Sequence, residues 1–266
     1  MSSPKELILE KKIEKLLDPS EKIIAHFLFH DQQINCLHDY ANIVSIKRLG
    51  YNDHGPVHMR KVVLNALVMA NLLHRAEIQL SLEKDEVCTF HDCRIGLMIA
   101  GFLHDVGMSI GRENHQLTGI VLAAPIIQRI LEKFYGDDLY KQVVLKSVII
   151  ECIIGHMADF SINSMEAGII LVADGCDMEK GRARIPMLLN TESKVGDIHK
   201  YSAAAIEKVL IEPGDSLPIK ITVRMTASVG FFQVEEVLLK KIDSSPIKNY
   251  IELYAGVIGR EIKCYL

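Results

Sequence analysis

The chain has 266 residues, of which 49% are hydrophobic and 24% charged, with 17 glycines and 8 prolines. This composition is typical of globular proteins and excludes collagen-like, low-complexity and largely disordered classes. The formal net charge is −4, from 30 basic and 34 acidic residues. We therefore expect no extended nucleic-acid surface, although a local basic pocket is compatible with these numbers.

The apolar stretches argue against a membrane or secreted protein. The first residues alternate charged and apolar side chains and lack the uninterrupted apolar run of a signal peptide. Stretches such as 95–103 and 119–127 are much shorter than the ~20 residues that span a bilayer. The six cysteines are scattered without a CxxC pair, which is typical of free thiols in a reducing compartment. We expect a cytoplasmic protein with no membrane partner.

The first two thirds of the chain show the three- and four-residue apolar spacing of helices. Pro19 and Gly50 mark helix ends, and Pro56 suits the first turn of a helix. In chain order, the pattern predicts helices at 6–17, 21–29, 33–49, 56–74, 84–103, 113–135, 138–156 and 165–174.

The pattern changes near residue 200. Segments 205–212 and 218–226 are rich in β-forming residues, and Pro213-Gly214-Asp215 between them is a turn signal. A helix at 234–242, an extended segment at 250–258 and a short run at 260–265 follow. We therefore expect a mainly α protein, with a helical domain at 1–198 and a small β-β-α-β, or α+β, subdomain at 199–266. Such a tail is too small to hold a large core alone, so we expect it to pack on the helical domain or on a second copy, as in a homodimer.

A histidine and an aspartate stand side by side at the end of a strongly apolar predicted helix, in the segment FLHDVG that contains His104 and Asp105. Adjacent ligands can hold one cation, and the second oxygen of a carboxylate can bridge to another. A buried carboxylate is costly unless it is paired or coordinated. The same dipeptide at His91-Asp92 lies among charged residues, as on a solvated face. We favour His104-Asp105 as the functional pair.

Three segments resemble a known family. His58-Met-Arg-Lys-Val, FLHDVG and Leu-Val-Ala-Asp174 resemble the His … His-Asp … Asp signature of the HD-domain superfamily of metal-dependent phosphohydrolases, over about residues 50–190. His54 competes with His58 as the first ligand, and Asp177 competes with Asp174. We prefer His58 because it lies within a predicted helix, whereas His54 precedes Pro56 in a loop.

Two further histidines resemble ligands of the two-metal members of that superfamily. His115 lies in a His-x-x-x-Gly segment, and His156 ends the next predicted helix. The resemblance implies two divalent ions, among which Mn, Fe, Mg, Zn and Ni are not distinguished. It also implies six ligands, namely His58, His104, Asp105, His115, His156 and Asp174.

The resemblance further implies that a metal-activated hydroxide hydrolyses a phosphate ester or phosphodiester of a small, nucleotide-like substrate, with His104 and Asp105 in the catalytic centre. Cations near the ligands in sequence are candidates to bind the substrate phosphate. These candidates are Arg60, Lys61, Lys180, Arg182 and Arg184. For the last three, an exposed, solvated loop is the alternative interpretation.

Two other functions remain open on the same ligands. Some proteins of similar ligand order are di-iron oxygenases, like the inositol-cleaving enzyme, and the ligands alone do not separate the two reactions. The second open function is a nucleotide-sensing module whose C-terminal unit reports to a partner. A full set of six ligands argues against a pure sensor. The role of residues 199–266 stays open, and dimerisation or shaping the site entrance would suit its size.

Overall fold

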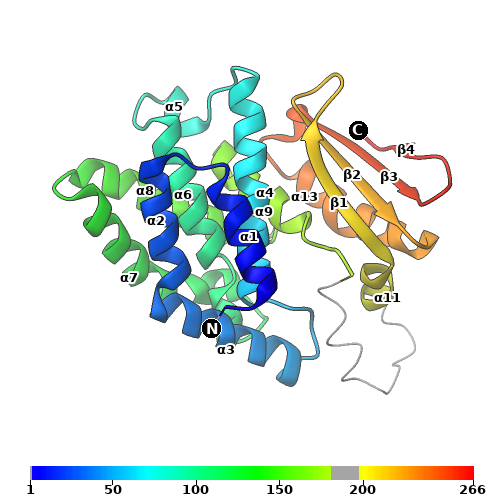
Figure 1. Cartoon of the computed structure of the whole chain (residues 1–266), viewed down its shortest axis with the longest axis horizontal. Coiled ribbons are helices and arrows are strands. Elements are labelled where there is room, and N and C mark those ends of the chain that lie inside the picture. Colours follow the sequence, from blue (N-terminus) through cyan, green and yellow to red (C-terminus); the bar gives the residue numbers. More distant parts are fainter. Residues whose placement is uncertain (1, 181–197) are drawn as a thin grey trace.

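The structure, a computed structural model, describes residues 2–180 and 198–266. The N-terminal part is helical, and most of its helices lie on the left in Figure 1. The α-helices are α1 (Pro4–Glu14), α2 (Pro19–His30), α3 (Gln32–Ile43), α4 (Pro56–Arg75), α5 (Ser81–Lys84), α6 (Phe90–Leu103), α7 (His115–Tyr135), α8 (Leu139–Gly155) and α9 (Met165–Gly175). Two short segments of other helical type are η1 (Val44–Arg48) and η2 (Val106–Ser109).

The C-terminal part is a small sheet with helices beside it (Figure 1). Its elements are α11 (Ile198–Ala205), β1 (Ile206–Pro213), β2 (Ile219–Met225), η3 (Ser228–Gly230), α12 (Phe231–Gln233), η4 (Val234–Leu238), α13 (Leu239–Asp243), η5 (Lys248–Tyr250), β3 (Ile251–Val257) and β4 (Lys263–Cys264). The strand order is β1-β2-β3-β4. Strand β2 pairs antiparallel with β1 and parallel with β3, because the helical segment between β2 and β3 crosses over the sheet.

The mainly α fold with a small C-terminal α+β part is confirmed. The single helix predicted at 84–103 is wrong, because α5 ends at Lys84 and α6 begins only at Phe90. Glu86 has a left-handed backbone (φ 59°), and Thr89 and Asp92 exchange hydrogen bonds as a capping box that starts α6. The helix α11 before β1 was not predicted. The division of the chain near residue 198 stays a prediction.

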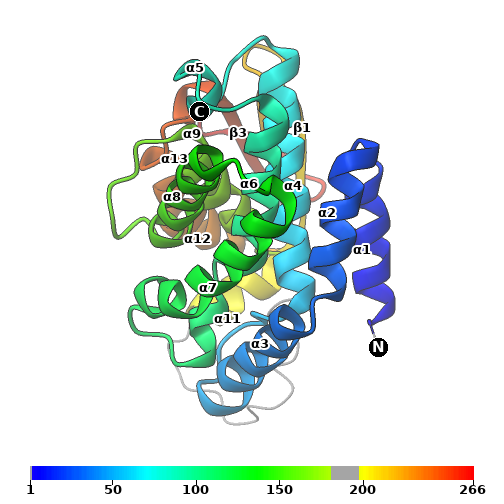
Figure 2. The ribbon, with the colours of Figure 1, turned by 90° about the vertical axis from the view of Figure 1, so that its left-hand side faces the viewer.

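Helices α4 and α6 lie at the centre, and α4 contacts α1, α6 and α9 (Figure 2). Helix α6 is buried from Ile95 to Leu103, which explains why its sequence is apolar on every face rather than on one stripe. The apolar core continues from these helices into the sheet, where it includes Ile221 and Leu253. The helical part and the sheet therefore share one core.

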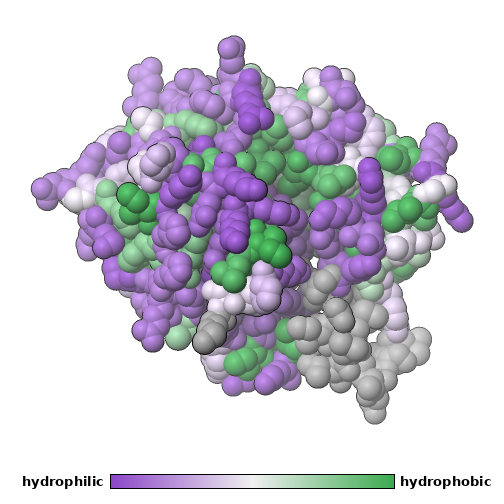
Figure 3. Space-filling view, viewed as in Figure 1, coloured by the Kyte–Doolittle hydropathy of each residue, from purple (hydrophilic) through white to green (hydrophobic). Residues whose placement is uncertain are grey.

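The surface view in Figure 3 is mostly hydrophilic, with hydrophobic groups scattered in small patches. Among residues 2–180 and 198–266, no helix combines the length and the apolar character needed to cross a membrane. The expected cytoplasmic location and homodimer stay predictions.

Candidate metal centre

Six side chains at the ends of five helical elements lie together in the interior. His58 is in the first turn of α4, and His115 is the first residue of α7. The other four follow or end helices: His104 caps α6, Asp105 comes directly after this cap, His156 caps α8 and Asp174 lies in the last turn of α9. Each of the four histidines is at most 1% exposed, and Asp105 is 3% exposed. The helices thus end at a common point, where polar groups replace the apolar core.

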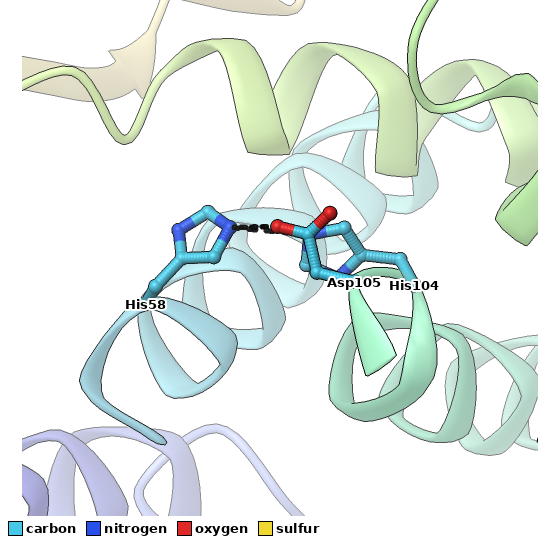
Figure 4. Close-up of side chains that lie close together, drawn as sticks. All are labelled: His58, His104 and Asp105. Carbon is cyan, nitrogen blue, oxygen red and sulfur yellow. Dashed lines mark hydrogen bonds and ion pairs between the residues drawn. The ribbon is translucent and has the colours of Figure 1, made fainter. Parts of the chain in front are cut away.

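The first subsite consists of His58, His104, Asp105 and Asp174. Nε2 of His58 lies 3.1 Å from Nε2 of His104 and 3.2 Å from Oδ2 of Asp105. Figure 4 shows these three side chains pointing toward one another from α4 and from the end of α6. Oδ1 of Asp174 lies 3.3 Å from Nε2 of His58 and 3.9 Å from Nε2 of His104. Two imidazoles and two carboxylates therefore surround one small volume.

The second subsite consists of Asp105, His115 and His156. Nε2 of His115 lies 3.0 Å from Nε2 of His156. Oδ1 of Asp105 lies 3.1 Å from the first of these nitrogen atoms and 3.2 Å from the second. Asp105 thus directs Oδ2 to one subsite and Oδ1 to the other, as a bridging ligand does.

The hydrogen bonds of the histidines leave Nε2 as the ligand atom. Nδ1 of His104, His115 and His156 lies 2.7–3.0 Å from the carbonyl oxygen three residues earlier, and Nδ1 of His58 lies 2.8 Å from Oδ2 of Asp177. These oxygens only accept, so Nδ1 carries the proton and Nε2 of the neutral ring carries a lone pair. Oriented histidines of this kind are typical of metal sites.

The spacing of the ligand atoms fits a shared cation. Two lone pairs that face each other at about 3 Å repel unless a cation lies between them. Ligand atoms bound about 2.1 Å from one metal ion, at angles of about 90–110°, are separated by roughly 3.0–3.4 Å. Most of the distances within each subsite fall in this range. The residues present therefore fit one divalent ion per subsite.

The electrostatic environment keeps the ligands in the form that binds metal. Burial raises the pKa of Asp105, but the imidazoles of His104 and His54 outweigh this effect and hold the pKa well below its usual value. For Asp174, burial is likewise outweighed, chiefly by the ammonium group of Lys241, and the pKa is again well below normal. Burial lowers the pKa of His156 to about 4, against the opposing effect of Asp105. Near neutral pH the carboxylates are ionised and this imidazole is neutral, as metal binding requires.

Gly107 allows the second subsite to form. A Cβ atom at this position would lie 1.9 Å from the carbonyl oxygen of His115 and 2.7 Å from the amide nitrogen of Gly119. The backbones of η2 and of the first turn of α7 are therefore in direct contact, which places His115 next to Asp105.

We expect Gly107→Ala to separate these backbones, at a cost of about 1–3 kcal/mol of stability, and to weaken metal binding at the second subsite. Thermal unfolding and metal titration measure the two effects. Gly111→Ala is the matched control, because a Cβ atom there meets nothing within 4 Å. Unchanged metal binding in Gly107→Ala would contradict the prediction.

The two rival ligands lie beside the first subsite. Asp177 accepts the hydrogen bond from Nδ1 of His58, on the opposite side of the ring from Nε2. It is thus placed to orient His58 rather than to share its cation. Nε2 of His54 lies 3.9 Å from Oδ2 of Asp105, farther than Nε2 of His58, and its Nδ1 lies near Ser45 and Asn52.

The repeated His91-Asp92 pair lies elsewhere. Nδ1 of His91 lies 3.1 Å from Asp18 and 3.5 Å from the buried Glu21, a separate group that could hold a metal ion. Asp92 caps α6 and contacts Lys141. This pair serves the start of α6 and is separate from the centre.

The predicted substrate cations are mostly engaged with carboxylates. Nζ of Lys61 lies 3.7 Å from Glu179, and Nζ of Lys180 lies 2.5 Å from Glu207. Arg182 and Arg184 lie outside the described residues. Arg60 is fully buried: its Nε donates to Glu10 at 2.7 Å, and its guanidinium lies 5.8 and 5.6 Å from the ring centres of Phe29 and Phe102. The structure thus places Arg60 between α1 and α4 in the core, where it stabilises the fold.

We expect Arg60→Met to destabilise the protein by about 3–5 kcal/mol, because it leaves the buried carboxylate of Glu10 without its partner. Metal stoichiometry should stay the same in the folded protein. The double variant Arg60→Met/Glu10→Leu should recover much of the loss, as apolar replacement of a buried ion pair often does. Denaturant unfolding of the two variants provides the measurement, and an undiminished free energy of unfolding in Arg60→Met would refute the structural role.

A cavity of about 390 Å³ reaches the candidate centre at Asp105, which the two subsites share, and at Asp174 of the first subsite. Tyr51, Arg112 and Lys241 also line it. Arg112 makes no ion pair with a carboxylate within 2–180 and 198–266; its guanidinium contacts the sulfur of Met157 and lies 6.0 Å from the centre of the Tyr51 ring. Sequence reasoning missed Arg112, although its position three residues before His115 could have indicated it. Lys241 carried no sequence signal, because it lies far along the chain from every ligand.

The comparisons with known proteins give one match of substantial length. The chain is 39% identical to "Uncharacterized protein MJ1020" of Methanocaldococcus jannaschii over 236 residues, which cover 89% of each chain. No family model matches the chain, and no solved structure matches it.

Proposed function

The chain belongs to the same family as the uncharacterized protein MJ1020, and we propose that it is an HD-type, metal-dependent phosphohydrolase. Its reaction is the hydrolysis of a phosphate ester or phosphodiester bond in a small, nucleotide-like molecule. The observation that carries this proposal is the carboxylate of Asp105, whose two oxygens face two separate histidine pairs. Paired divalent ions that share a ligand are a common device for hydrolysing phosphate esters.

His58, His104, Asp105 and Asp174 would hold one ion, and Asp105, His115 and His156 the other. Bound divalent ions supply Lewis acidity and lower the pKa of water enough to give hydroxide near neutral pH. The protein residues fix the geometry: each Nδ1 hydrogen bond orients a ring, and burial of the ligands excludes competing water.

The cavity at the candidate centre suits a small anionic substrate. Its volume of about 390 Å³ lies within the usual range for small-molecule sites. Arg112 lines this cavity and has no carboxylate partner among the described residues, so its guanidinium is available for a phosphate oxygen. A planar guanidinium can hold two such oxygens at once. We therefore assign the phosphate-binding role to Arg112 rather than to the cations predicted from the sequence.

Elemental analysis combined with a phosphate-release screen tests the proposal. We expect about two divalent ions per chain, and release of phosphate or of a nucleoside phosphate from members of a panel of nucleotides and phosphodiesters. Arg112→Met should raise KM, and Arg112→Lys should recover part of the loss. A metal-loaded protein that cleaves no member of the panel would count against hydrolysis. Oxygen consumption by an iron-loaded sample would then favour the oxygenase, and tight nucleotide binding without turnover would favour the sensor.

A further inference from the structure

The C-terminal unit contributes a buried lysine to the metal centre. Lys241 lies in α13 and is only 7% exposed. Its Nζ donates to Oδ2 of Asp174 at 2.5 Å and to the carbonyl oxygen of His156 at 2.7 Å. Lysine is almost never buried unless its charge is paired. One ammonium group therefore contacts a residue of each subsite.

Two glycines of α9 allow α13 to approach this closely. A Cβ atom at Gly175 would lie 3.0 Å from Cδ of Lys241 and 3.2 Å from a methyl carbon of Leu238. A Cβ atom at Gly168 would lie 2.5 Å from the hydroxyl of Ser245. Residues seven apart lie on the same face of a helix, so one face of α9 is kept small along its contact with the C-terminal unit.

The same helical stretch lines the cavity. Gln233, Val237 and Lys241 all line it, and they are spaced four residues apart along the consecutive segments α12, η4 and α13. Such spacing places side chains on one face. The C-terminal unit therefore forms one wall of the cavity, and Arg112 from the helical part also borders it.

The ammonium group of Lys241 has a donor to spare. An ammonium group has three N–H donors, and Asp174 and His156 take two of them. Within 2–180 and 198–266 no other acceptor for Lys241 is found, and the residue lines the cavity. The two hydrogen bonds fix the position of the ammonium group. A ligand that accepts from the third N–H therefore binds without the entropy cost of ordering this side chain.

We propose that residues 231–243 complete the substrate site and that Lys241 binds an oxygen of the substrate's phosphate group. This inference rests on the proposed function, since it takes the cavity at the candidate centre as the phosphate site. It gives the C-terminal unit a direct role in substrate binding.

Calorimetric titration of inorganic phosphate into the Mn²⁺-loaded full chain tests the inference without any turnover. We expect Lys241→Met and Lys241→Gln to weaken phosphate binding by about tenfold or more, because a hydrogen bond between charged groups is lost. Lys241→Arg should stay within about threefold of the original chain, because it retains the charge and the donors. Lys241→Gln keeps a donor for Asp174 and serves if the Met variant does not fold. Lys240→Met is the matched control, since Lys240 is exposed and pairs with Glu236.

Two results would overturn the inference: phosphate binding that is equally tight in Lys241→Gln, or loss of Mn²⁺ together with phosphate. The second result would limit Lys241 to holding Asp174. Absence of phosphate binding to the original chain would also overturn it. A chain that binds phosphate through Lys241 but hydrolyses no phosphate ester would support the inference and refute the proposed function, so the two failures are distinguishable.

Discussion

Asp105→Ala is expected to remove both metal ions at once, lowering the metal content from about two ions per chain to none and hydrolysis to background. The reason is that the two carboxylate oxygens face different subsites: Oδ2 faces His58 and His104, whereas Oδ1 faces His115 and His156. Among the described residues, no other side chain contributes to both of the candidate metal groups at this centre. Mass spectrometry under native conditions, or elemental analysis after gel filtration, gives the ion count.

Single-subsite variants sharpen this prediction. His58→Ala should lose the first ion and keep the second, whereas His115→Ala should show the reverse. His74→Gln is the matched control, because His74 is exposed and belongs to none of the candidate metal groups among the described residues. Retention of one tightly bound ion in Asp105→Ala would show that the two subsites do not depend on a shared carboxylate.

The second large expected effect is on thermal stability, which removal of the metal ions should lower. An ion present at about 100 times its dissociation constant stabilises the folded state by about 2.7 kcal/mol, so two ions contribute roughly 5 kcal/mol. For a chain of about this size, 1 kcal/mol corresponds to roughly 2–4 °C in Tm. We therefore expect a chelator to lower Tm by about 10–20 °C and Mn²⁺ to restore it.

The physical cause lies in the buried ligand atoms. Without cations, unprotonated ring nitrogens face each other at 3.0 and 3.1 Å in the interior, and ionised carboxylates stay buried beside them. Asp105→Ala is the control, since its Tm should not respond to a chelator. An equal Tm for the chelated and loaded forms of the original chain would contradict metal binding at this centre.

The sequence by itself predicted the helical part, the C-terminal elements other than α11 and the His104-Asp105 pair. The other four candidate ligands came from the resemblance to the HD-domain superfamily. The signals in the sequence were local: apolar residues at helical spacing, proline and glycine at helix ends, and a carboxylate at the end of an apolar run. The break before α6 was missed because the apolar Val87 and Cys88 lie in the turn before the helix, while the cap that starts the helix depends on only Thr89 and Asp92.

Tertiary structure decided which neighbours of the ligands face the cavity. Arg60 is two residues after His58, but two residues correspond to about 200° around a helix, so its side chain faces α1 and Glu10 instead. Lys241 reaches Asp174 across 67 positions of the chain. Helical periodicity indicates which face of an element is buried but carries no information about the element that covers it. The cations around the metal centre are therefore fixed by packing between distant segments, whereas its ligands are marked by where each helix ends.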